Sequence, residues 1–337
     1  MARSLAAFAL FCAALLPLPG HALDHTQVAV IMNTLDPLSV EIAEYYASRR
    51  AIPIQNVIRV GFPHGRSTLT AGEFAALNAW VLEKTPPGIE AYVLTWAAPY
   101  RVECMSITSA FAFGFDAAFC ADTCRPTRRS PYFNSSSRLP FSDLGIRPAM
   151  SIAATTFAQA KALIDRGVDA DGTAPDGTVY LLSTSDAARN VRSNSYPMVE
   201  NMLKGHVRVN VLKQDALKNA QDVLFYFTGV SAVRELDTLK FVRGAIADHL
   251  TSGGGNLTDS SQMSALRWLE AGTTASYGAV VEPCNMPQKF PTPPVVIARY
   301  LQGETLIEAY WKSVLMPGQG IFIGEPLAAP FVRKKTQ

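Results

Sequence analysis

The sequence predicts an α/β protein with a mostly parallel sheet that is covered by helices on both faces. Two observations predict this class. Short apolar runs of strand length alternate with longer segments in which apolar residues recur at helical spacing. Several of the predicted strands are also apolar at consecutive positions, which is typical of strands buried on both sides in a parallel sheet.

The predicted strands and helices alternate along most of the chain. The helix expected over 70–84 begins with Thr70 and Glu73, which have the spacing of a capping box. Strands are expected at 27–32, 56–60, 91–96, 177–184, 207–212, 222–229, 241–250 and 273–282. Further helices are expected at 36–50, 156–167, 187–205 with an interruption near Pro197, 260–272, 295–301 and 305–314.

A long irregular insertion interrupts this pattern at about 98–147. It is rich in Cys, Gly, Pro, Ser and Arg and shows neither the helical nor the strand period. Long irregular segments in compact domains are often functional, so we expect surface specificity here. Because no linker is visible, residues 23–337 are expected to form a single α/β domain.

Residues 1–22 have the pattern of a cleavable secretory signal peptide. Arg3 is followed by an apolar run over 5–16, by helix-breaking prolines and by a small-residue boundary at Ala22, where we expect cleavage. The apolar run is too short for a hydrocarbon core of roughly 30 Å, and no later stretch is long enough. We therefore expect a periplasmic or secreted protein without a membrane span after cleavage.

Composition excludes several classes of function. The formal net charge is only +2, and the basic residues are scattered apart from three Arg in 125–129, so no nucleic-acid partner is expected. The run TSGGGN at 251–256 lacks the spacing of nucleotide-binding loops, and no cofactor is expected. The acidic segment 165–177 departs from the calcium-loop template, because the twelfth position of a loop that begins at Asp169 is Tyr180 and not an acid. A polar turn rather than a metal site is therefore predicted.

Four cysteines are expected in the mature chain, because Cys12 lies in the predicted signal peptide and is removed with it. An even number in an oxidising compartment predicts two disulfides among Cys104, Cys120, Cys124 and Cys284. Three pairings are possible. We favour Cys120 with Cys124 and Cys104 with Cys284, because the first three cysteines share one loop region.

One possible catalytic group is Asp248, His249 and Cys284. Asp248 and His249 end a predicted strand, and the carboxyl ends of parallel strands are where α/β sheets assemble their sites. Of the four histidines after the signal, only His249 is placed for acid–base work, with Asp248 as its orienting group and a Cys284 thiolate as nucleophile. The alternatives are a histidine bonded to a backbone carbonyl and a cysteine in a disulfide.

A carbohydrate-binding role is a third hypothesis. It would use the aromatic side chains of Trp96, Tyr100, Tyr132 and Phe133, which packing in the core explains equally well. The motifs H-E-x-x-H, C-x-x-C and G-x-S-x-G do not occur in the sequence. Zinc peptidases, thioredoxin-type proteins and α/β-hydrolases therefore have no supporting residues.

Several blocks of the sequence resemble a secreted bacterial family of unassigned activity that accompanies the exosortase protein-sorting system. This resemblance implies export, an association with envelope or exopolysaccharide biology, and an envelope protein or polysaccharide as partner. It implies no particular reaction. The blocks span nearly the whole chain after the signal, at 39–53, 92–114, 244–255, 273–285 and 303–331.

The C-terminal part also resembles gingipain-type cysteine peptidases, which implies a caspase-like fold. The shared features are a Gly-Ala strand, a helix of G-x-T-L-x-E-A type and a loop that reads Gly324-Glu325-Pro326 here. Those peptidases carry a His after one strand and a Cys after the next. The matching positions here, at 227–230 and 247–255, hold neither residue in that role.

The resemblance therefore leaves enzymatic activity undecided. It is consistent with a non-catalytic accessory or binding factor in exosortase-linked surface assembly. It is also consistent with a cysteine-dependent hydrolase whose site is rebuilt from Asp248, His249 and Cys284. We take the non-catalytic factor as the leading hypothesis, because a clear signal peptide stands beside missing catalytic residues.

Overall fold

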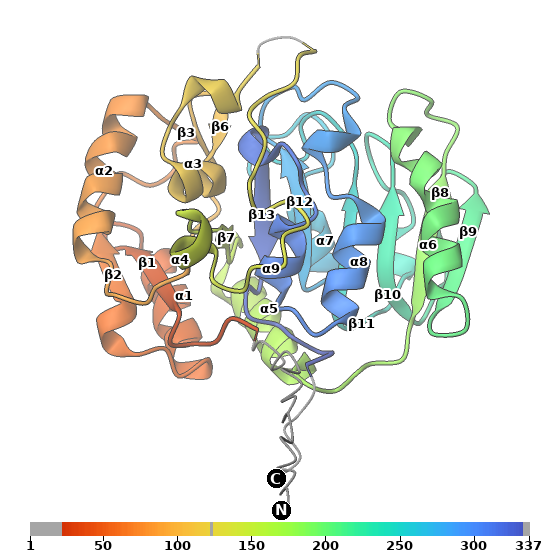
Figure 1. The fold of residues 1–337 in the computed structure, drawn as a ribbon, viewed down its shortest axis with the longest axis horizontal. Helices are drawn as coiled ribbons and strands as arrows, with labels where there is room; N and C mark the ends of the chain where they lie inside the picture. The colour runs from red at the N-terminus through yellow and green to blue at the C-terminus, as the bar shows by residue number, and fades with distance from the viewer. Residues whose placement is uncertain (1–21, 122–123, 333–337) are drawn as a thin grey trace, which may run out of the picture.

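The computed structural model describes residues 22–121 and 124–332. The predicted signal peptide, except for Ala22, lies outside these residues. A ten-stranded, mostly parallel sheet is flanked by helices on both faces, and a small three-stranded sheet lies beside it (Figure 1). The predicted α/β class is therefore confirmed. Among the helices of the described part, none combines the length and the apolar character that crossing a bilayer requires.

The central sheet is built from strands far apart in the sequence. From one edge to the other, its order is β2 (Val57–Val60), β1 (Val28–Asn33), β4 (Ala91–Leu94), β7 (Ala149–Ser151), β13 (Gly320–Gly324), β12 (Ala275–Ala279), β11 (Phe241–His249), β10 (Val223–Thr228), β8 (Thr178–Ser183) and β9 (Arg208–Lys213). The small sheet contains β3 (Thr68–Leu69), β5 (Arg101–Val102) and β6 (Met105–Ser106). The last strand in the sequence, β13, thus lies near the middle of the main sheet.

Parallel pairing joins the strands on each side of the centre. The strands β2, β1, β4 and β7 are parallel to their neighbours, as are β12, β11, β10, β8 and β9. Strand β13 runs antiparallel to β12 over five residue pairs, from Ala275 with Gly324 to Ala279 with Gly320. It meets β7 through the single pair Ser151 and Ile323. The sheet is therefore continuous only because β13 bridges its two parts.

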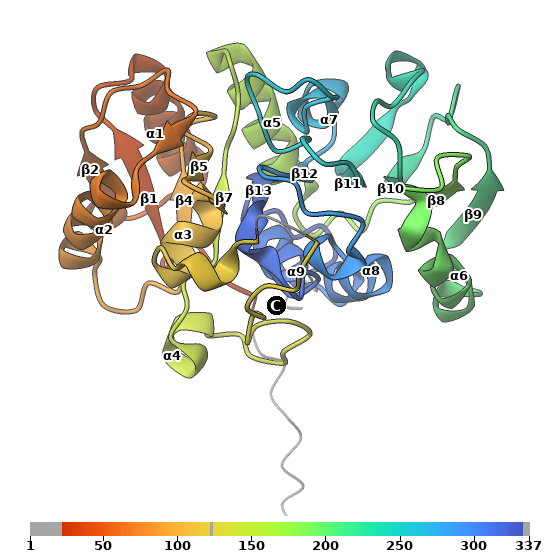
Figure 2. The same cartoon turned by 90° about the horizontal axis from the view of Figure 1, so that it is seen from above.

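The helices form two layers, one on each face of the sheet (Figure 2). One layer contains α1 (Pro37–Arg49), α5 (Phe157–Ala170) and α7 (Leu266–Ala271), which contact one another in sequence order. The other contains α2 (Ala71–Lys84), α3 (Ile107–Phe113), α6 (Tyr196–Leu203), α8 (Pro293–Leu301) and α9 (Leu306–Trp311). A short helix, α4 (Pro140–Leu144), and six 3-10 turns complete the described secondary structure. Strands covered on both sides bury every residue, as in β1 and β10.

Local sequence explains where the helices begin. The predicted capping box of α2 is confirmed: the Thr70 side chain accepts a bond from Glu73 N–H at 3.2 Å, and Glu73 accepts one from Thr70 N–H at 2.8 Å. The interruption predicted near Pro197 is present as a change from a 3-10 turn at 190–195 to α6. Pro197 lies in the first turn of α6, because a proline tolerates that position, where its missing N–H would be unpaired anyway.

The predicted insertion is more ordered than its composition suggested. The region 98–147 contains β5, β6, α3 and α4, and α3 packs on β7 and β13. Strands β7 and β13 have no counterpart among the predicted strands. They contain three and five residues, and β13 begins and ends with glycine. Runs this short give too little periodicity to identify.

The structure contains two disulfides, as predicted, but the favoured pairing is wrong. The bonds join Cys104 to Cys120, with Cα atoms 5.7 Å apart, and Cys124 to Cys284, with Cα atoms 5.3 Å apart. A 3-10 turn at 117–119 places Cys120 against the hairpin of β5 and β6, where Cys104 lies. Cys124 instead meets the loop after β12. Proximity in the sequence was therefore a poor guide to proximity in space.

The two disulfides are expected to differ in their contribution to stability. Cys124–Cys284 joins residues 160 positions apart, and Cys104–Cys120 joins residues 16 apart. Because a longer closed loop restricts the unfolded chain more, paired Cys→Ser changes should lower the free energy of unfolding by about 5 and about 3 kcal/mol, respectively. Denaturant unfolding under non-reducing conditions measures both values. A larger loss for the Cys104–Cys120 pair would contradict this expectation.

Candidate functional site

The structure separates the three predicted catalytic residues. Asp248 and His249 are fully buried at the end of β11, where they pair in register with Phe227 and Thr228 of β10. Successive side chains on a strand point to opposite faces of the sheet. Asp248 therefore faces the layer of α8, and His249 faces α7 on the other side, so Asp248 does not orient the His249 ring.

Both ring nitrogens of His249 are used in the core. Nδ1 accepts a hydrogen bond from the indole N–H of Trp268 at 2.9 Å, and Nε2 lies 3.1 Å from the carbonyl oxygen of Met263. A neutral ring with its proton on Nε2 satisfies both contacts. Burial, helped by the charge of Arg192, lowers the pKa of His249 to about 3. This geometry matches the alternative of a histidine bonded to a backbone carbonyl.

Asp248 forms a buried ion pair with Arg192, which lies in the 3-10 turn at 190–195. The distance from Oδ1 to Nη1 is 2.6 Å, and both side chains are almost fully buried. Arg192 also donates to the carbonyl oxygens of Thr228 at 2.9 Å and Pro291 at 3.3 Å. Burial raises the pKa of Asp248, and the charge of Arg192 opposes that shift. The pair ties the ends of β10 and β11 to the segment before α8.

Cys284 is not available as a thiol in this structure. Its sulfur is bonded to Cys124, and its backbone N–H donates to Glu282 at 2.7 Å. A cysteine nucleophile must be a free thiolate. The described structure therefore lacks the predicted arrangement of nucleophile, base and orienting carboxylate.

The aromatic residues considered for carbohydrate binding are mostly in the core. Trp96 and Tyr100 are 2 % exposed and Tyr132 is fully buried, whereas Phe133 is half-buried. The Trp96 indole donates to the carbonyl oxygen of Pro99 at 3.1 Å and packs edge-on against Phe62. Rings that are covered in this way cannot stack on a sugar, so this prediction is wrong for the first three residues.

The acidic segment 165–177 uses its carboxylates in ion pairs. Asp165 accepts hydrogen bonds from Tyr45 at 2.6 Å, Arg49 at 2.9 Å and Lys161 at 2.6 Å. Asp171 pairs with Arg50, which also pairs with the buried Glu325 after β13. Within the described ranges, no cluster of three His, Cys, Asp or Glu side chains is arranged to hold a metal ion.

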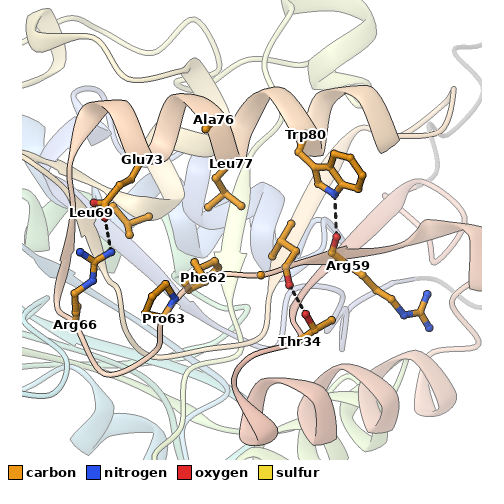
Figure 3. A pocket seen from close by; sticks show the side chains of 12 residues that line it. Thr34, Arg59, Phe62, Pro63, Arg66, Leu69, Glu73, Ala76, Leu77 and Trp80 are labelled. Atoms are coloured by element: carbon orange, nitrogen blue, oxygen red, sulfur yellow. Dashed lines mark hydrogen bonds and ion pairs between the residues drawn. The ribbon is translucent and has the colours of Figure 1, made fainter.

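Among the described residues, the strongest candidate for a binding site is a groove between α2 and β2 that the sequence analysis did not predict (Figure 3). It has a volume of about 590 Å³ and lies at the carboxyl ends of β1 and β2. Its lining is mainly apolar, with a few charged side chains: Thr34, Arg59, Val60, Gly61, Phe62, Pro63, Arg66, Leu69, Glu73, Ala76, Leu77 and Trp80. Concave, largely apolar surfaces with a few polar groups are typical ligand sites.

The position of the groove also favours ligand binding. Open α/β sheets bind ligands outside the carboxyl ends of their strands. A hollow of about 650 Å³ elsewhere in the described part is lined by 174–177 and 205–208, where β8 and β9 begin rather than end. The groove between α2 and β2 is therefore the stronger candidate.

Trp80 is the most informative residue of the groove. Its side chain is 47 % exposed, and its indole N–H donates to the backbone carbonyl of Arg59 at 3.0 Å (Figure 3). The sequence did hold a signal for it. Helix α2 contacts the core through its buried residues Phe74 and Val81. It also carries Leu77, Trp80 and Leu82, which are apolar but are not buried in the core.

Three basic side chains lie at the groove, and one of them, Lys84, pairs with Glu83 at 2.8 Å. Arg59 and Arg66 lie toward opposite ends (Figure 3), and the Lys84 ammonium lies 4.6 Å from the centre of the Trp80 ring. Glu73 is bonded to Arg66 at 2.8 Å. The bonds from Thr70, joined by Arg66, lower the pKa of Glu73 to about 2, which keeps this carboxylate charged.

We expect His249 to make stability depend on pH. The pKa of His249 is about 3 in the folded protein and near 6.5 in the unfolded chain, so between these values the unfolded state binds more protons. Its stabilising contribution is complete above pH 6.5 and is lost as the pH falls toward 3, by at most about 1.4 kcal/mol per pH unit. Urea unfolding at several pH values gives the free energy of unfolding as a function of pH. Its slope against pH between 3 and 6.5 should be shallower for His249→Gln. Equal slopes would contradict this.

The Asp248 carboxylate should be required to keep Arg192 in the core. Asp248→Asn removes the partner of a buried guanidinium, and we expect a loss of about 3–5 kcal/mol in the free energy of unfolding. Denaturant titration measures it. The exposed pair of Arg208 and Asp176 supplies the control, since Asp176→Asn should have no measurable effect. A double variant with Arg192→Met should recover part of the loss.

The groove offers an apolar surface, an exposed indole and basic side chains, with no thiol, hydroxyl–imidazole pair or metal cluster among its lining residues. Comparison of the chain with protein-family models, with curated proteins and with solved structures finds no match.

Proposed function

We propose that this protein is an exported, non-catalytic binding or accessory factor in exosortase-linked envelope or exopolysaccharide assembly, and that the groove between α2 and β2 is its ligand site. One observation carries the proposal. The only predicted nucleophile, Cys284, is in a disulfide, and the only predicted base, His249, has both ring nitrogens bonded in the core. Two disulfides also support an oxidising compartment.

The packing at the ends of β10 and β11 supports a non-catalytic relative of the caspase-like peptidases. The matching positions in those peptidases hold the catalytic His and Cys. Here β10 ends at Thr228, and the next residue is pressed against another segment: a Cβ atom at Gly229 would lie 1.9 Å from the carbonyl oxygen of Arg189. The space that a catalytic side chain would need is filled by backbone.

One position in the loop after β11 is equally closed, although a Cβ atom at Gly253 would have no neighbour closer than 3.5 Å. A Cβ atom at Gly255 would lie 2.5 Å from the carbonyl oxygen of Gly278 on β12, and the Gly255 N–H donates to Ala279 at 2.8 Å. Glycine is needed where two backbones approach this closely. A cysteine at Gly255 could not be introduced without moving β12.

Thiol labelling tests the proposal directly. Native protein treated with iodoacetamide without reductant should show no modified cysteine by mass spectrometry, whereas reduced and unfolded protein should be labelled throughout. Cys120→Ser supplies the positive control, because it frees the Cys104 thiol. Fluorogenic peptide substrates should show no turnover. Labelling of Cys284 in the native protein together with turnover would overturn the proposal.

A further inference from the structure

We propose that the groove binds an extended, acidic peptide segment of another protein, which adds as a new strand to the outer edge of β2. This inference rests on the proposed binding function and names the ligand of that same site. In such strand addition, main-chain hydrogen bonds supply affinity and the surrounding side chains supply selectivity.

The outer edge of β2 has unused backbone groups. The Val60 carbonyl accepts from Thr34 N–H at 2.8 Å, and the Phe62 N–H donates to the Asn33 side chain at 3.2 Å, so the backbone of both residues faces β1. By alternation, the backbone groups of Arg59 and Gly61 face outward. Because β2 is the end strand of the sheet, no strand pairs with them.

Trp80 occupies the place that an added strand would take. Its indole N–H donates to the outward carbonyl of Arg59 at 3.0 Å, and the ring stays half exposed above the groove. A backbone N–H of an incoming strand would make the same bond to the same oxygen. Trp80 therefore supplies the hydrogen bond to the Arg59 carbonyl in the free protein. This bond must break when a strand is added.

The side chains around the edge favour an acidic ligand with an apolar middle. Leu77 and Phe62 form the apolar wall and floor, and Arg59 and Arg66 lie toward opposite ends (Figure 3). Arg66 pairs with Glu73 and Lys84 pairs with Glu83, each at 2.8 Å, so the basic side chains near the groove exceed the acidic ones by one, Arg59. Carboxylates flanking an apolar segment would complement this pattern.

A second copy of the chain is a poorer occupant. The free edges of the sheet are β2 and β9, and β9 begins with Arg208 and ends with Lys213. Pairing either edge with β2 would bring basic side chains together, and like charges on neighbouring strands are destabilising. A polysaccharide lacks the regular alternation of N–H and C=O groups that the edge of β2 can pair with.

The test uses a fluorescein-labelled synthetic peptide with alternating Val and Thr in the middle and two Asp at each end. Fluorescence anisotropy with the full protein should show saturable binding. The same peptide N-methylated at alternate amides should bind at least about tenfold more weakly, because it loses two or more main-chain bonds. A peptide with Lys in place of Asp should also bind more weakly.

Two protein variants locate the binding to the edge. Trp80→Phe keeps a ring but removes the competing N–H, so the acidic peptide should bind about 2–10-fold more tightly. Gly61→Pro removes an outward N–H and should weaken binding by a similar factor. Gly61→Ala is its matched control, because an added Cβ has no neighbour closer than 3.7 Å.

Several results would overturn strand addition: no binding of the acidic peptide, equal binding of its N-methylated form, or weaker binding by Trp80→Phe. The N-methyl and Trp80→Phe comparisons decide the matter even where Gly61→Pro fails to fold. These failures are distinct from failure of the proposed function, which thiol labelling and peptide turnover report. A non-catalytic factor could still bind another ligand if the acidic peptide failed.

Discussion

The alternation of side chains along the buried end of β11 determines which helix layer each of its two polar side chains contacts. A strand covered on both faces must find a partner for each polar side chain in the layer that it faces. Asp248 forms an ion pair with Arg192 on the side of α8, and His249 accepts a hydrogen bond from Trp268 on the side of α7. Two residues that are neighbours in sequence thus bind to helix layers on opposite faces of the sheet. Both side chains are buried and neither reaches the surface.

The polar residues at the end of β11 are buried, whereas the groove between α2 and β2 lies at the edge of the sheet. Helix α2 covers β2 incompletely, because its apolar residues extend past the face that Phe74 and Val81 bury. The indole of Trp80 then takes over the hydrogen bond that the next strand of a larger sheet would supply. The groove is therefore a consequence of where the sheet ends, and the ligand that we propose for it follows from the unpaired backbone groups of this edge.

Sequence patterns predicted the parts of this structure that depend on local order. The alternation of strands and helices and the Thr70–Glu73 capping box depend on neighbouring residues, and both are present in the structure. The cysteine pairing depends on which distant loops contact each other. The order of strands around β13 likewise depends on contacts between distant segments. The partners of Asp248 and His249 come from 192, 263 and 268, which only the folded chain brings together.

The position of β13 has a consequence for the route by which the chain reaches its folded state. This strand is almost the last segment of the sequence, yet it is the only bridge between β7 and β12. The two parts of the sheet cannot join before Gly320–Gly324 has been synthesised. Structures that depend on such long-range contacts form slowly. Joining the two parts of the central sheet is therefore a non-local step of folding that waits for β13.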